Sequence, residues 1–283
     1  MMEYVSHTTM TSLISSPSVV SSKVVIFDSG VGGLSIYHEI YKILPNLHYL
    51  YVFDNVVFPY GEQSEKKTIQ RVVSIITAVS RFYQLSLVVI ACNSASIVSL
   101  PALRSRFVFP IVGVVPAIKP AAKLTRNGVL GILATRGTVR RSYTNELLSR
   151  FAGACSITML GSKELVELTE SKLRGNIVPS KTIKRILRPW LTMSAPPDTV
   201  VLGCTHFPLI REELKNALPK GTKLIDSGEA IARRIECLLG NTLHAIGPKT
   251  HNIALCMDVN QKALQLVPAL KYYGFLTLQE LKL

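Results

Sequence analysis

Residues Val88–Ser96 read VVIACNSAS, and residues Val200–Pro208 read VVLGCTHFP. In each stretch, four apolar or small residues lead directly into a cysteine, which is followed by a polar side chain and a predicted helix start. A short apolar run of this kind indicates a fully buried parallel strand. Cys204 follows Cys92 by about the length of one domain. We therefore interpret the two stretches as equivalent positions in a pseudo-symmetric pair of α/β halves.

Strands alternate with helices on both sides of these stretches. The apolar run Lys23–Asp28 predicts a buried strand that leads into the glycine-rich turn DSGVGG and then a helix. Further helices are predicted over Val139–Phe151 and Asn260–Tyr273. This alternation predicts an α/β fold of two doubly wound domains with mostly parallel sheets and an active site in the cleft between them.

Two stretches predict the crossovers between the domains. The first is the proline-bearing run Val112–Lys123, and the second is Ile225–Gly228, with Asp226 as the cap of the next helix. The predicted segments are a flexible tail of residues 1–22, a first domain of residues 23–116 with 228–283, and a second domain of residues 117–227.

Composition limits the functional classes. The five cysteines among 283 residues form no CxxC pair and no Cys/His cluster, which argues against a disulfide framework and a metal site. Residues 1–22 lack the features of a secretory signal, and no apolar run reaches the roughly 20 residues of a transmembrane helix. We therefore expect a cytoplasmic protein with no membrane association.

The formal net charge of +14 has two interpretations. It could mark a nucleic-acid surface. The basic residues, however, are scattered over predicted helical faces, and no DNA- or RNA-binding motif accompanies them. We expect a solvated surface that also attracts anionic metabolites, without direct nucleic-acid binding; a macromolecular partner is the alternative.

The two cysteines lie at predicted carboxyl ends of strands, where open α/β sheets bind ligands. A helix that starts at such a cysteine favours its thiolate form. The alternative, a small buried apolar side chain, is weakened because two cysteines share one setting. Two thiols that face each other across a cleft suit stereoinversion, since one removes an α-proton and the other protonates the opposite face. Such chemistry needs no cofactor.

Polar groups near the cysteines could hold the carboxylates and ammonium of a small acidic amino acid. They are Asp28, Ser29, Tyr60, Gly61, Asn93, Ser94, Thr205 and His206.

At this point the chain resembles the glutamate racemases of the aspartate/glutamate racemase superfamily, the bacterial enzymes that make D-glutamate for peptidoglycan. The resemblance implies that Cys92 and Cys204 are the paired acid/base residues and that the eight polar residues above contact L- or D-glutamate. Asp28 and His206 would also tune the thiols. The matching motifs are FDSGVGG (Phe27–Gly33), FPYGE (Phe58–Glu62), ACNSAS (Ala91–Ser96), the run Gly113–Lys119, ATRGT (Ala134–Thr138) and LGCTHFP (Leu202–Pro208).

Two positions add detail to the resemblance. Ser94 stands where the family usually has threonine, so the hydroxyl is kept and one methyl is lost. Glu170 either matches an acidic residue that supports Cys204 and His206, or lies on a solvated face.

Resemblance to the enteric-type members, through the long N-terminus and VVPAIKPAA, implies activation by UDP-N-acetylmuramoyl-L-alanine. The alternative is that the basic residues at this crossover are ordinary solvated charges. The expected activator site comprises Arg104, Gly113, Val114, Val115, Pro116, Ala117, Ile118 and Lys119.

Three other functions compete with this interpretation. The stretch GVGGLS, with Asp54 downstream, is similar to the glycine-rich motif of dinucleotide-binding domains. However, Ser35 stands where that motif has its third glycine, and the Asp28 carboxylate would repel a pyrophosphate. An aspartate or hydantoin racemase is the rival within the superfamily. A regulatory role on a nucleic-acid enzyme such as DNA gyrase, reported for some glutamate racemases, would coexist with catalysis.

Overall fold

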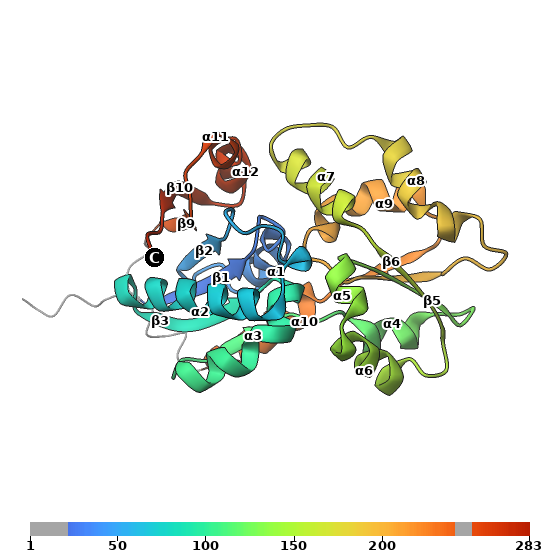
Figure 1. Cartoon of the computed structure of the whole chain (residues 1–283), viewed down its shortest axis with the longest axis horizontal. Helices are drawn as coiled ribbons and strands as arrows, with labels where there is room; N and C mark the ends of the chain where they lie inside the picture. Colours follow the sequence, from blue (N-terminus) through green and yellow to red (C-terminus); the bar gives the residue numbers. More distant parts are fainter. Residues whose placement is uncertain (1–21, 241–250) are drawn as a thin grey trace, which may run out of the picture.

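Two sheets of parallel strands organise the molecule (Figure 1). The structure is a computed structural model that describes residues 22–240 and 251–283, so the predicted tail of residues 1–22 lies outside the described residues except for Ser22. The first sheet has the strand order β10-β9-β2-β1-β3-β4, and the second has the order β6-β5-β7-β8. We call each sheet with its helices a half. The predicted α/β fold with parallel sheets is confirmed.

The first half is built on strands that are buried on both faces. All six residues of β1 are buried, because helices cover both sides of the sheet. Helices α1, α10 and α12 pack on one face, and α2 and α3 pack on the other. Its strands are β1 (Lys23–Asp28), β2 (Tyr49–Phe53), β3 (Leu85–Ile90), β4 (Ile111–Gly113), β9 (Asn252–Cys256) and β10 (Phe275–Glu280). Its helices are α1 (Leu34–Ile43), the 3-10 helix η1 (Tyr60–Glu62), α2 (Glu65–Phe82), α3 (Asn93–Arg106), α10 (Gly228–Leu239), α11 (Gln261–Leu264) and α12 (Val267–Tyr272).

The second half repeats this plan on a smaller sheet. Helices α7, α8 and α9 pack on one face, and α4 and α6 pack on the other. Its strands are β5 (Val129–Ala134), β6 (Ser156–Gly161), β7 (Thr199–Leu202) and β8 (Lys223–Ile225). Its helices are α4 (Ile118–Leu124), α5 (Arg136–Arg140), α6 (Ser142–Phe151), α7 (Lys163–Leu173), α8 (Ser180–Leu191), the 3-10 helix η2 (Phe207–Ile210) and α9 (Arg211–Ala217).

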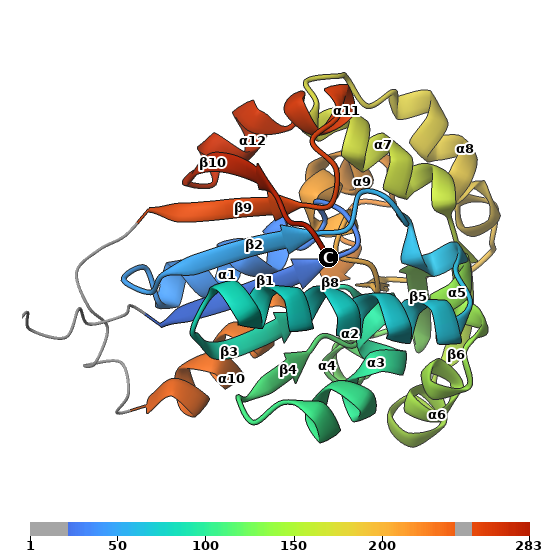
Figure 2. The ribbon, with the colours of Figure 1, turned by 60° about the vertical axis from the view of Figure 1, so that its left-hand side comes forward.

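Two predicted helices are each interrupted. The predicted helix Asn260–Tyr273 is divided into α11 and α12, where Pro268 in the first turn of α12 cannot continue the preceding hydrogen-bond ladder. The strand β10, which the sequence analysis missed, then pairs in parallel with β9 and completes the edge of the sheet (Figure 2). The predicted helix Val139–Phe151 is divided at Arg141, whose backbone is extended between α5 and α6.

The chain passes between the two sheets after β4 and again after β8, and we call these two connections the crossovers; they are hydrogen-bonded to each other. The Ser227 hydroxyl donates to the carbonyl of Val115 at 2.5 Å. The prediction of Asp226 as helix cap is wrong by one residue, because Ser227 occupies that position in α10. The Asp226 carboxylate instead accepts from the Gly228 N–H at 2.8 Å and pairs with Arg211.

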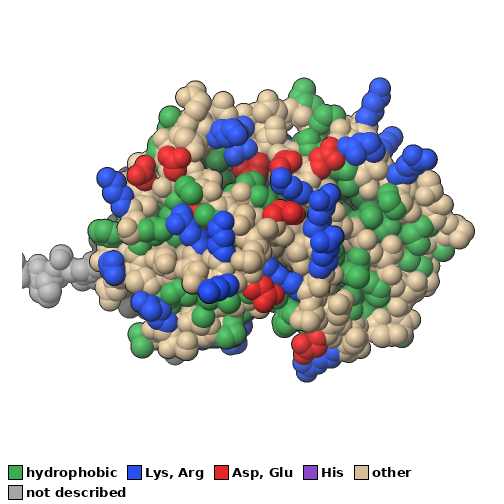
Figure 3. Space-filling view, in the orientation of Figure 1, with side chains coloured by type: hydrophobic (Ala, Val, Ile, Leu, Met, Phe, Trp, Pro, Cys, Tyr) green, Lys and Arg blue, Asp and Glu red, His purple; other side chains and the backbone are tan. Residues whose placement is uncertain are grey.

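Basic side chains are distributed over both halves. On the face seen in Figure 3, Lys and Arg lie dispersed, with Asp and Glu between them. This distribution agrees with a solvated surface and not with one nucleic-acid stripe on that face. Within residues 22–240 and 251–283, no helix is both long and apolar enough to span a bilayer.

Trp190 at the end of α8 tests the packing of the second half. Its side chain is fully buried, and its indole N–H donates to Thr158 at 3.0 Å. We expect Trp190→Ala to cost about 3–5 kcal/mol of unfolding free energy, and Trp190→Phe about 1–3 kcal/mol, since the ring is largely retained. Urea unfolding followed by circular dichroism measures both, because Trp190 is the only tryptophan in the sequence and its fluorescence is lost in each variant. Equal, small costs for the two variants would contradict this packing.

Candidate active site

The carboxyl ends of strands from both sheets meet at one small cavity. Asp28 ends β1, and Cys92 and Cys204 follow β3 and β7 closely. The cavity has a volume of ≈ 10 Å³, about the space of one water. All ten residues that the sequence analysis assigned to catalysis or substrate contact line it: Asp28, Ser29, Tyr60, Gly61, Cys92, Asn93, Ser94, Cys204, Thr205 and His206. It is completed by Phe58, Pro59, Thr135, Val166 and Gly203.

Cys92 occupies the N-cap position of α3, as expected from the sequence. Its Sγ lies 3.6 Å from the Ser29 hydroxyl. Burial, and then the nearby Asp28 carboxylate, raise the pKa of the Cys92 thiol to about 12. The helix N-terminus therefore does not suffice to make this thiol acidic.

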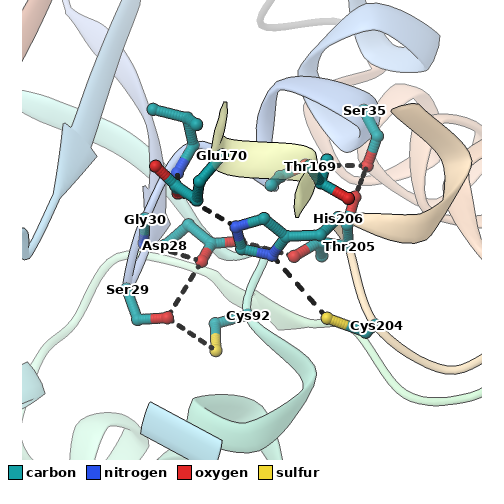
Figure 4. Close-up of polar contacts among 12 residues, drawn as sticks. Asp28, Ser29, Gly30, Ser35, Cys92, Thr169, Glu170, Cys204, Thr205 and His206 are labelled. Atoms are coloured by element: carbon teal, nitrogen blue, oxygen red, sulfur yellow. Dashed lines mark hydrogen bonds and ion pairs between the residues drawn. The ribbon is translucent and has the colours of Figure 1, made fainter. Parts of the chain in front are cut away.

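Cys204 has a different environment, contrary to the expectation of a helix start at both cysteines. It is followed by a turn and the short 3-10 helix η2. Its Sγ lies 3.7 Å from Nδ1 of His206, and Nε2 of the same ring lies 3.0 Å from Oε1 of Glu170 (Figure 4). Although burial lowers the pKa of His206, its hydrogen bonds to Cys204 and Glu170 outweigh this and raise the pKa to about 10. The contacts with Cys204 and Glu170 therefore favour the protonated form of the His206 ring.

Glu170 is buried, with 4% of its surface exposed, so the solvated-face alternative for this residue is wrong. Oε1 also accepts from the Val31 N–H at 2.9 Å, and Oε2 pairs with Arg174 at 2.7 Å. Burial would raise its pKa, but the bond to His206 and these donors hold the pKa below its usual value.

The glycine-rich turn allows the halves to approach closely. A Cβ at Gly30 would lie 2.5 Å from Oε1 of Glu170, and one at Gly32 would lie 2.4 Å from Nδ1 of His206. The space beside the turn is therefore filled by the second half of the same chain. This arrangement opposes the dinucleotide alternative, in which that space would hold a pyrophosphate.

Asp28 is fully buried and joins the halves. Its Oδ2 accepts from the Thr205 hydroxyl at 2.9 Å, and Oδ1 accepts from Ser29 and from the Gly30 N–H. Burial raises the pKa of Asp28.

Asp54 has a role that the sequence analysis did not anticipate. It accepts from the Tyr60 hydroxyl at 2.8 Å and from Arg71 at 2.6 and 3.0 Å. The backbone N–H groups of Val56 and Val57 also point to it. Asp54 therefore fixes the segment that carries Tyr60 and Gly61 over the cavity. No sequence signal identified it, because its side-chain partners Tyr60 and Arg71 lie on η1 and α2, outside the strand that Asp54 follows.

Hydroxyl and amide groups complete the lining. The hydroxyls of Ser94, Thr135 and Thr138 lie 3.0–3.3 Å from one another across the interface of the halves. Oδ1 of Asn93 is buried without a hydrogen-bond partner among the described residues. A buried amide oxygen of this kind can accept from a ligand ammonium.

The residues expected to bind an activator lie at the first crossover. The run begins at Gly113, the last residue of β4, and continues through the crossover into α4. Arg104 is exposed on α3 and donates to the carbonyl of Ile111, while Lys119 lies over the ring of Phe151. In the part of the chain that the structure describes, neither cation has a carboxylate within 4.0 Å.

Comparison with known proteins agrees with this geometry. The Asp/Glu/Hydantoin racemase family matches residues 31–235. A glutamate racemase of Erwinia tasmaniensis is 62% identical over 94% of each chain. The structure of Escherichia coli glutamate racemase in complex with L-glutamate and the activator UDP-MurNAc-ala superposes with a TM-score of 0.88 at 61% identity, covering 92% of this chain and 98% of that one. A glutamate racemase isoform of Bacillus anthracis gives a TM-score of 0.75 at 26% identity, with coverages of 93% and 98%.

The His206–Glu170 pair predicts how stability depends on pH. The pKa of His206 rises from 6.5 to about 10 on folding, so its stabilisation is complete below pH 6.5 and is lost as the pH rises through about 10. Between pH 7 and 10, we expect the melting temperature of the wild type to fall more steeply than that of His206→Gln. The exposed His38→Gln is the control and should follow the wild type. Parallel curves for the wild type and His206→Gln would contradict the coupling.

Proposed function

The chain belongs to the Asp/Glu/Hydantoin racemase family, and from this premise we propose that it interconverts L- and D-glutamate with Cys92 and Cys204 as the two proton-transfer groups. It is a racemase, and therefore an isomerase. The observation that supports the proposal best is the meeting of two thiols, one from each half, in a single small cavity. Glutamate is favoured over aspartate or a hydantoin because relatives at 61–62% identity are glutamate racemases.

The reaction needs one thiolate and one thiol. The thiolate removes the α-proton from one face, and the opposite thiol donates its proton to the other face, so the two cysteines exchange protonation states in each turnover. Burial of Cys92 makes its thiolate a stronger base, at the cost of a smaller thiolate population. Nδ1 of His206 lies 3.7 Å from Sγ of Cys204, where it can hydrogen-bond to this sulfur during proton transfer.

Substrate would be held by the polar lining. The unpaired Oδ1 of Asn93 is suited to the ammonium group, and the hydroxyls of Ser94, Thr135 and Thr138 are suited to a carboxylate. Because the cavity of ≈ 10 Å³ is smaller than glutamate, the halves must separate to admit it. The two crossovers are where this motion would be accommodated.

Solvent deuterium tests the proposed reaction. L-Glutamate incubated with the enzyme in deuterated water, without added cofactor and with a chelator present, should become an equal mixture of enantiomers with deuterium at the α-carbon. Cys92→Ser and Cys204→Ser should each lower the rate by about 10²–10⁴-fold, because a serine hydroxyl is a much weaker acid than a thiol.

Two other cysteines provide matched controls for this test. Cys155 is half-buried and Cys237 is exposed, and both lie outside the cavity. Their serine variants should keep near-normal rates. Equal losses at all four positions, or a requirement for pyridoxal phosphate or metal, would exclude the two-thiol mechanism.

We also propose activation by UDP-N-acetylmuramoyl-L-alanine at Arg104 and the run Gly113–Lys119. The E. coli relative was solved with UDP-MurNAc-ala, and the expected residues here lie on the crossover between the halves. An anion held by Arg104 and Lys119 would bias closure without touching the substrate. Synthesis of D-glutamate for peptidoglycan follows as the proposed role of the product, while gyrase binding and a cytoplasmic location stay predictions.

The activation proposal predicts a specific loss. Saturating nucleotide should raise the wild-type racemisation rate; a coupling of 1–3 kcal/mol would change substrate affinity by roughly 5- to 150-fold. Arg104→Ala should lose most of this response and keep its basal rate. Arg106→Ala removes the same charge from the same end of α3 and should respond normally. An unchanged wild-type rate at saturating nucleotide would refute the proposal.

A further inference from the structure

The two thiols have unequal electrostatic partners. Cys204 has the His206 ring 3.7 Å away. Cys92 has a neutral hydroxyl, that of Ser29, and the carboxylate of Asp28, which disfavours its thiolate. If each thiol must act as base in one direction, Cys92 also needs a positive charge nearby.

Arg141 contacts the helix turn that begins at Cys92. Its extended backbone between α5 and α6 interrupts the helix and places its side chain against the first half. Nη1 donates to the carbonyl of Ser94 at 2.5 Å, two residues after Cys92 in the first turn of α3. The contact therefore crosses from the second half to the backbone that carries Cys92.

Among residues 22–240 and 251–283, the guanidinium of Arg141 has little compensating negative charge close to it. Its side chain is 9% exposed, and its carboxylate partner, Glu65, is 3.9 Å away with a side chain that is 66% exposed. A solvated pair at this distance contributes little, whereas a buried charge without a close partner is costly. Burial lowers the pKa of Arg141, and the charges that oppose this effect are Glu65 and the Cys92 thiolate.

We propose that Arg141 is a positioning residue for the Cys92 half of the reaction, which fixes the first turn of α3 and supplies positive charge to the Cys92 thiolate. The inference rests on the proposed function. It assigns to Cys92 a cation from the opposite half, as His206 serves Cys204 from its own half. Closure of the halves would then both bring the thiols together and make Cys92 a competent base.

Several other groups act on Cys92, and the test must separate them from Arg141. Asp28 and the Cys204 thiolate oppose ionisation of Cys92, and Tyr51 and Tyr60 also interact with it. None of these is altered by a substitution at position 141. Arg140, one residue earlier, is exposed, so Arg140→Met removes the same charge and serves as the matched control.

Alkylation by iodoacetamide reports the thiolate without substrate. The reagent is neutral, so a change at Arg141 does not alter its attraction to the site, and mass spectrometry gives the ratio of modified Cys92 to modified Cys204. At pH 8, Arg141→Met should lower this ratio roughly tenfold, which corresponds to one pKa unit. Arg140→Met should leave the ratio unchanged, and Arg141→Lys should restore part of it.

Racemisation kinetics provide the second readout. Arg141→Met should lower kcat/KM by about the same tenfold factor from L- and from D-glutamate, because enantiomers have equal free energies and the equilibrium constant cannot change. If the contact between Arg141 and Ser94 were purely structural, its loss would open the halves and expose both thiols. The ratio of modified Cys92 to modified Cys204 would then stay unchanged or rise, and either result overturns the proposal. If the wild type fails to racemise glutamate, the proposed function fails, and the alkylation ratio still decides the role of Arg141.

Discussion

The buried carboxylate of Glu170 is shared between the halves of the molecule. It accepts from the backbone of Val31 in the first half and from His206 and Arg174 in the second. A buried carboxylate with several donors has a lowered pKa, and its charge helps to raise the pKa of the His206 ring beside Cys204. The glycines of the DSGVGG turn are needed because a Cβ at Gly30 or Gly32 would occupy the space of this pair. Fold and chemistry therefore depend on the same contact.

Sequence symmetry does not produce electrostatic symmetry. Both cysteines follow an apolar strand, but only Cys92 begins an α-helix, and only Cys204 has a histidine two residues later. An inverting enzyme needs each thiol to act as acid and as base, so two different environments must give two usable thiols. In the proposed mechanism, His206 and Arg141 would meet this requirement from different elements.

The small volume of the cavity has consequences for how substrate enters. Asp54 and Arg71 hold the Tyr60 segment over the site, while Thr205 and Asp28 join the halves beneath it. Closure desolvates the thiols and raises the pKa of Cys92. The hydrogen bond between Ser227 and Val115 joins the two crossovers, where the proposed opening for substrate exchange would be accommodated.

The sequence by itself determined the alternation of strands and helices, the repeat around the two cysteines and the set of polar residues beside them, because these depend on local apolar runs and on motifs within a few positions. It did not determine the break at Arg141, the extra strand β10 or the cap at Ser227, since short elements depend on the sheet and helices that they join. The roles of Asp54 and Arg141 were decided by the tertiary structure alone, and for Glu170 the structure chose between the two alternatives that the sequence left open. Each acts through a partner on another element, at distances of 2.5–3.0 Å that no spacing along the chain encodes.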